Sequence, residues 1–318
     1  GHHQFDRAIG RLALLAHLEA FFSGGGQDAA QGVALGDLSQ EALHRHGPAP
    51  QVEVGHQLVA AGGGVPAETD ISGSGVIDGH RLILPVGGRP GSSLVCLHKE
   101  TGKVLWKSGD DEAAYSSLVI GTLAGVRQVV AFTADALLGA DLETGRVLWR
   151  TPLKTNAKRH AATPVLAGNR VIVNSHTFGL RCFEIAAADG GLQVREAWAN
   201  PALAINLATL VSVGPCLYGQ GAKSDFICVD TATGQLRWSQ AGFGLGRKDY
   251  ASTIAAGDRL LVLTEDGTLI LLAANPARYT ELGRLQACGS TWSFPALAGG
   301  KLYVRDARQL VCLDLAQP

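Results

Sequence analysis

The chain has 318 residues with 27 basic and 28 acidic side chains, which gives a formal net charge of −1. This balance argues against a dedicated nucleic-acid surface or a polybasic membrane surface, because both need clustered Lys and Arg. The 41 glycines follow no Gly-X-Y period, so the chain is not collagen, and they indicate many tight turns between short strands. The sequence has no methionine, and we therefore expect it to be a processed product or a fragment.

Residues 1–72 form an atypical N-terminal segment that lacks tryptophan and strand-like alternation. Arg7 to Phe22 is typical of a short amphipathic helix. Its apolar part, Ala8 to Phe22, is too short for a membrane span and too charged for a signal-peptide core. Glycine runs follow at Gly24 to Gly26 and at Gly62 to Gly64. We expect this segment to be partly helical or disordered, either as a rearranged or out-of-frame stretch or as a divergent extension.

Residues 73–318 are organised by an internal repeat. The stretch from Leu94 to Trp106 recurs from Leu137 to Trp149 and from Phe226 to Trp238, and a degenerate copy ends at Trp198. Two further copies, at Leu269 and Leu310, keep the first strand of this pattern and lose the tryptophan. An apolar run with a glycine-containing turn precedes each copy, so the unit has four strands and repeats about every 43 residues. This period predicts an all-β fold, a β-propeller of four-stranded blades with six blade units visible.

The shared motif Asp-x-x-Thr-Gly-x-x-x-Trp has a physical explanation. Asp and Thr side chains can hydrogen-bond the backbone of the turn, and Gly supplies the positive φ that a hairpin turn with a bulge needs. The large flat tryptophan is expected to pack on the neighbouring blade. We therefore assign a structural docking role to Gly102, Gly145, Gly234, Trp106, Trp149, Trp198 and Trp238.

These residues resemble the tryptophan-docking motif of the pyrroloquinoline-quinone (PQQ) type propeller repeats. The stretch from Ile83 to Trp149 is most similar to the BamB-like, quinoprotein-like uncharacterised group. The resemblance covers about residues 73–318, and it implies an eight-bladed propeller, whereas six units are visible. It also implies a bacterial protein in the periplasm or elsewhere outside the cytoplasm.

Two functions follow from the resemblance. The first is a non-catalytic binding or assembly scaffold, with a protein partner or a small polar ligand at the propeller face, no nucleic acid, no membrane-spanning segment and no cofactor. The alternative is a quinoprotein dehydrogenase that oxidises alcohols with PQQ and calcium. Such enzymes carry a vicinal cysteine pair, an acid and an asparagine for calcium, and a catalytic aspartate. This chain has no adjacent cysteines and shows no convergent catalytic set, which favours the scaffold.

Candidate ligand-binding residues lie where the first strand of each unit begins, because propellers bind ligands at the mouth of the central channel. The predicted ring consists of Tyr115, Lys154, His160, Asn206, Tyr250 and Trp292. Lys154, with Arg159 and Lys248 nearby, would suit an anionic or polar ligand. In the competing interpretation, these residues plug the channel and bond loop backbones.

Three other features of the sequence have structural explanations. The run Asp110-Asp111-Glu112 could supply oxygen ligands to calcium, but it lacks alternating spacing, and a solvated turn is favoured. His98 occupies the Asp position of the motif and is expected to cap its turn. Four cysteines share one repeat position and predict a small buried apolar site, whereas Cys216 and Cys228 could pair; the four are Cys96, Cys182, Cys228 and Cys312.

Overall fold

The computed structural model describes residues 73–88, 91–155, 158, 160–243 and 250–315. The atypical segment 1–72, with its predicted helix, and Arg159 and Lys248 lie outside the described residues. Within the described ranges the regular structure consists of strands, without any helix. The predicted all-β fold, with blade-like antiparallel sheets of the propeller class, is confirmed.

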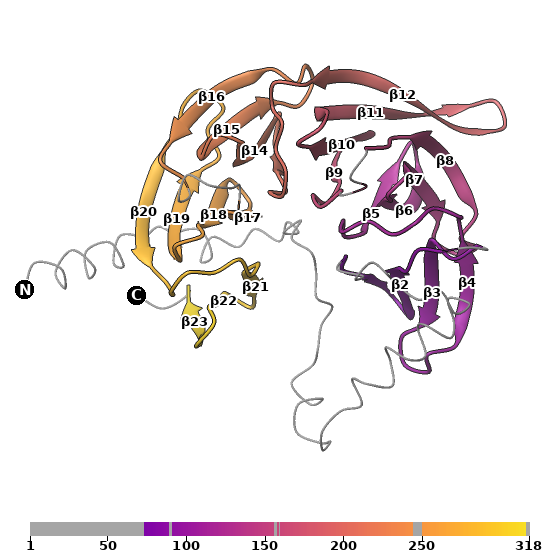
Figure 1. The fold of residues 1–318 in the computed structure, drawn as a ribbon, viewed down its shortest axis with the longest axis horizontal. Coiled ribbons are helices and arrows are strands. Elements are labelled where there is room, and N and C mark those ends of the chain that lie inside the picture. The colour runs from indigo at the N-terminus through magenta and orange to yellow at the C-terminus, as the bar shows by residue number, and fades with distance from the viewer. Residues whose placement is uncertain (1–72, 89–90, 156–157, 159, 244–249, 316–318) are drawn as a thin grey trace, which may run out of the picture. The chain divides into compact units, whose positions relative to one another are not determined.

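The described residues fall into two compact units. One unit contains residues 73–177 and 181–197, and the other contains residues 178–180 and 198–315. In each sheet the strands are antiparallel neighbours in chain order, so every blade is a meander (Figure 1).

The first unit contains two complete four-stranded sheets and most of a third. The strands of the first sheet are β1 (Val76–Asp78), β2 (Arg81–Pro85), β3 (Leu94–His98) and β4 (Val104–Ser108). The second sheet consists of β5 (Val119–Leu123), β6 (Val126–Phe132), β7 (Ala136–Asp141) and β8 (Val147–Pro152). The third consists of β9 (Val165–Ala167), β10 (Arg170–Ser175), β11 (Gly179–Ala188) and β12 (Gly191–Asn200).

The second unit contains two four-stranded sheets and one of three strands. The fourth sheet is formed by β13 (Val211–Val213), β14 (Cys216–Gln220), β15 (Asp225–Asp230) and β16 (Leu236–Ala241). The fifth is formed by β17 (Ser252–Ala256), β18 (Arg259–Leu263), β19 (Thr268–Ala273) and β20 (Glu281–Gln286). The sixth comprises β21 (Ala296–Ala298), β22 (Lys301–Arg305) and β23 (Leu310–Asp314). Five of the six sheets thus have the predicted four strands. The sheet of β17 to β20 keeps its fourth strand, β20, although the motif tryptophan is absent there.

The Thr-Gly turns have the predicted hydrogen bonds. The Asp141 carboxylate accepts bonds from the Glu143 and Thr144 amides at 3.0 and 2.8 Å, and from the Thr144 hydroxyl at 2.8 Å. Gly145 has a φ of 72°, and the register shifts between Gly139 and Ala140, which is the expected bulge. The turn is therefore built by its own side chains.

His98 caps its turn as predicted from its place in the motif. Its Nδ1 atom accepts a hydrogen bond from the Glu100 amide at 3.4 Å, where an aspartate oxygen serves in the second and fourth sheets. The ring also lies 5.5 Å from that of His80. The contacts of His98 thus lie within its own sheet.

The tryptophan of one sheet contacts the turn of the next. The Trp106 indole N–H donates to the Leu142 carbonyl at 3.0 Å, and a Cβ placed on Gly145 would lie 2.5 Å from the Trp106 ring. In the second unit Trp198 donates to the Thr231 carbonyl at 3.1 Å, and a Cβ placed on Gly234 would lie 2.3 Å from the Trp198 ring. Glycine at this turn position thus allows both a positive φ and the close approach of an indole ring.

Two tryptophans have other surroundings. Trp238 donates to the Asn275 carbonyl at 2.9 Å and meets the Tyr279 ring edge-on at 6.1 Å. Trp149 donates to the side-chain oxygen of Gln128, in its own sheet. The following sheet has ten-residue strands, β11 and β12, and no Thr-Gly turn between them. The buried Gln128 therefore replaces a turn carbonyl as the acceptor of the Trp149 indole N–H.

The repeated cysteine position is buried in three of its four copies. Cys96, Cys182 and Cys228 have no solvent exposure, and burial raises the pKa of their thiols to about 11, 12 and 12. Cys312 is exposed, contrary to the prediction, because β23 has no strand beyond it within the described sheet. None of the six cysteines forms a disulfide in the described structure, so Cys216 and Cys228 are not paired.

Candidate binding surface

The predicted ring residues occupy loops that lead into first strands, and they divide between the two units. Tyr115, Lys154 and His160 belong to one unit, and Asn206, Tyr250 and Trp292 belong to the other.

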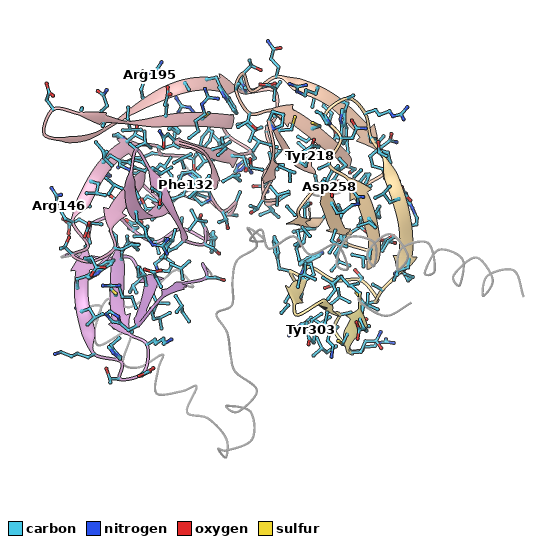
Figure 2. All side chains as sticks on the ribbon, turned by 180° about the vertical axis from the view of Figure 1, so that it is seen from behind. Phe132, Arg146, Arg195, Tyr218, Asp258 and Tyr303 are labelled. Carbon is cyan, nitrogen blue, oxygen red and sulfur yellow. The ribbon has the colours of Figure 1, made fainter. Side chains whose placement is uncertain are left out.

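His160 lies inside its unit and is inaccessible to solvent. Its Nδ1 lies 2.7 Å from the Thr133 carbonyl oxygen, and its Nε2 lies 3.4 Å from the Thr155 hydroxyl. The ring stacks on Phe132, labelled in Figure 2, with centroids 4.0 Å apart. Burial lowers the pKa of His160, so the ring is neutral at pH 7. In this arrangement the side chain joins two loops.

Lys154 and Tyr115 are the two members of this set that reach solvent. Lys154 Nζ lies 2.9 Å from the Asp135 carboxylate, and this pairing lowers the pKa of Asp135. The charge of Lys154 is therefore balanced locally, which weakens the case for an anionic ligand. Tyr115 is 38% exposed.

Two acids of the run, Asp110 and Glu112, are exposed as predicted for a solvated turn, whereas Asp111 is not. Asp111 is buried, and its carboxylate accepts bonds from Arg150 at 2.7 Å and from the Thr133 hydroxyl at 3.0 Å. Asp110 accepts a bond from the Gly91 amide at 2.7 Å, and Glu112 pairs with Lys158 at 2.7 Å. The run fastens the loop after β4 to neighbouring loops, because each carboxylate meets a donor there.

This donor set does not fit a calcium site. The two buried carboxylates, Asp111 and Asp135, already face the cations Arg150 and Lys154. Across the described ranges, no group of three or more His, Cys, Asp or Glu side chains is arranged to hold a metal ion.

The second unit brings two of the predicted residues together. The rings of Tyr250 and Trp292 stack with centroids 4.4 Å apart and planes 19° apart. Trp292 is 65% exposed, and its indole N–H donates to Glu265 Oε1 at 3.0 Å. Asn206 is half-buried on the loop before β13. The exposed aromatic pair is the feature of the predicted ring that offers a surface to a ligand.

Sequence reasoning missed Glu265, Asp135 and Gln128. Glu265 and Asp135 lie in the tight turns between the second and third strands of their sheets, where acids are ordinary turn residues. Gln128 lies opposite the motif residue Asp141, a strand position that Arg81, Arg259 and Lys301 hold in other sheets, so its polar character gave no signal.

The repeat region is similar to a known family. The family model of the outer membrane protein assembly factor BamB matches residues 90–240. This match supports a PQQ-like, BamB-like family for this part of the chain. The match spans the second and third sheets, all but the last residue of the fourth, and strands β3 and β4 of the first.

The solved structures that match the chain include two crystal structures. The crystal structure of BamB from Moraxella catarrhalis is 17% identical, with a TM-score of 0.43, covering 77% of this BamB-like chain and 83% of that one. The computationally designed Ika8 protein is 13% identical, with a TM-score of 0.43, covering 78% and 86%. A search of curated proteins finds no match. Within the described ranges, no helix has the length and apolar character needed to cross a bilayer.

Proposed function

We propose that this BamB-like chain is a non-catalytic scaffold that binds a protein partner outside the cytoplasm. The observation that carries the proposal is the match of residues 90–240 to the model of the outer membrane protein assembly factor BamB. Similarity to this family supports a role in binding and assembly, although one fold can host many functions.

The geometry of the predicted ring agrees with a binding role. A general acid or base must reach its substrate, whereas His160 is buried between Phe132 and two loops. The acids Asp111 and Asp135 hold basic side chains in place. Two of the ring residues that face solvent, Tyr115 and Trp292, are aromatic, and aromatic side chains are enriched in protein interfaces.

A two-part experiment tests the scaffold function. The purified full chain is titrated with PQQ and calcium, and alcohol oxidation is followed with a redox dye; we expect no turnover above a buffer blank. In parallel, cells producing the tagged chain are cross-linked and fractionated, and we expect a cross-linked protein in the extracytoplasmic fraction. Turnover with PQQ and calcium would identify a quinoprotein dehydrogenase and refute the scaffold function.

A further inference from the structure

A cluster of exposed aromatic side chains marks the loop between β20 and β21. Trp292 is 65% exposed and Phe294, two residues further on, is 61% exposed. One face of the Trp292 ring lies against Tyr250, which leaves its other face to solvent. Adjacent exposed aromatic rings of this size are typical of interaction sites.

The backbone of this loop holds Trp292 in place. The Thr291 amide donates to the Glu265 carbonyl at 2.9 Å, and the Thr291 hydroxyl donates to the Arg305 carbonyl at 2.6 Å. The Ser293 amide donates in turn to the Thr291 hydroxyl at 3.0 Å. Because the residues on both sides of Trp292 are fixed, a ligand that contacts the indole loses little free energy in ordering it.

Glu265 places a negative charge at the edge of the indole. Its Oε1 atom accepts the Trp292 N–H at 3.0 Å. Its Oε2 atom is buried and has no hydrogen-bond partner in the part of the chain that the structure describes. Glu265 also takes part in none of the ion pairs found among the described residues. Arg305, the basic residue that this loop contacts, does so through its backbone carbonyl.

We propose that Tyr250, Trp292 and Glu265, the aromatic–acid platform, bind an arginine side chain of a partner protein. A guanidinium placed over the open face of Trp292 is attracted by the ring quadrupole and by the nearby carboxylate. Arginine suits this position better than lysine, because its planar, weakly hydrated head group stacks on aromatic faces. This inference rests on the proposed scaffold function, and it gives the partner a chemistry opposite to the anion suggested by Lys154.

The test uses the full chain and two matched peptides, acetyl-Gly-Arg-Gly-amide and its citrulline counterpart, which has the same shape without the charge. Binding is followed by the NMR signal of the Trp292 indole N–H, which is assigned as the signal lost in Trp292→Phe. We expect a saturable shift with the arginine peptide at millimolar concentration, and a response at least threefold weaker with citrulline.

Two variants separate the platform from general surface effects. Glu265→Gln keeps an oxygen acceptor for the indole and removes the charge, and we expect arginine affinity to fall about threefold to fivefold. Leu310→Ala removes another exposed apolar side chain of the same unit, 69% exposed, and should leave affinity unchanged. Equal shifts with both peptides, or unchanged affinity in Glu265→Gln, would overturn the inference. The cross-linking and PQQ experiments do not depend on this signal, so a failure of the scaffold function is recognised separately.

Discussion

The contact between Trp106 and Gly145 allows a matched test of how neighbouring sheets are joined. Gly145 and Gly168 both occupy hairpin turns with positive φ, 72° and 58°. A Cβ at Gly145 would lie 2.5 Å from the Trp106 ring, whereas a Cβ at Gly168 would meet nothing within 4 Å. Replacing each glycine by alanine therefore adds the same backbone strain at both sites and a steric clash at one of them.

The expected destabilisation follows from these contacts. Alanine in the left-handed region costs roughly 1–2 kcal/mol at either position. At Gly145 the indole must also move, which breaks its bond to the Leu142 carbonyl at a cost of about 0.5–1.5 kcal/mol. Exposing about 40 Å² of the buried ring adds about 1 kcal/mol. Gly145→Ala should therefore lower the free energy of unfolding by about 2 kcal/mol more than Gly168→Ala.

Urea unfolding of the two variants measures this difference, followed by circular dichroism and by tryptophan fluorescence. The two signals should give coincident transitions where unfolding is two-state. In a Trp106→Ala background the extra cost of Gly145→Ala should disappear, since the clashing ring is gone. Equal destabilisation by the two glycine substitutions in the parent chain would refute the idea that the indole needs a bare backbone there.

Three further predictions concern single side chains. In the folded protein a thiol reagent should modify Cys312 rapidly and the five buried cysteines only after unfolding, so one fast thiol per chain is expected; two or more would contradict the burial. Gln128→Leu should lower the free energy of unfolding in urea by about 1–3 kcal/mol, because the Trp149 indole loses its acceptor. Gln128→Glu keeps an oxygen at this position and should retain the hydrogen bond. Equal chemical shifts of the Trp149 indole N–H in the two variants would contradict this role of Gln128. Burial lowers the pKa of His160 in the folded state, so the unfolded state takes up a proton first as the pH falls. The free energy of unfolding should therefore fall as the pH drops below about 6.5, by at most about 1.4 kcal/mol per pH unit. His160→Gln should reduce this slope, and an unchanged slope between pH 5 and 7 would assign the pH dependence to other groups.

Hairpins and their turns were predictable because their determinants are local. The Asp, Thr and Gly of each Thr-Gly turn lie within five residues, so the chain specifies the turn, its bulge and its positive φ without distant help. The same locality made the capping role of His98 predictable. These short-range rules, repeated along the chain, were enough to give the fold class.

Other features depend on contacts between distant parts of the chain. Asp111 was expected in solvent, but Arg150 and Thr133, which follow it by 39 and 22 residues, enclose it. The exposure of Cys312 depends on whether a further strand lies beside β23, which the local pattern does not reveal. Of the six candidate ring residues, sequence position located the loops correctly, while the burial of His160 and the stacking of Trp292 required the fold.

Because Gln128 replaces a turn carbonyl as the acceptor of the Trp149 indole, one hairpin of the fold can tolerate insertions better than the others. Trp106 and Trp198 each donate a hydrogen bond to a carbonyl at the turn of the following sheet. An insertion in either of those turns would displace the acceptor of the indole N–H. Trp149 donates to Gln128 in its own sheet, so the hairpin of β11 and β12 does not supply its acceptor. The tip of this hairpin, at Gly190 and Gly191, is therefore a position where extra residues, a tag or a fused domain can be added without loosening the array.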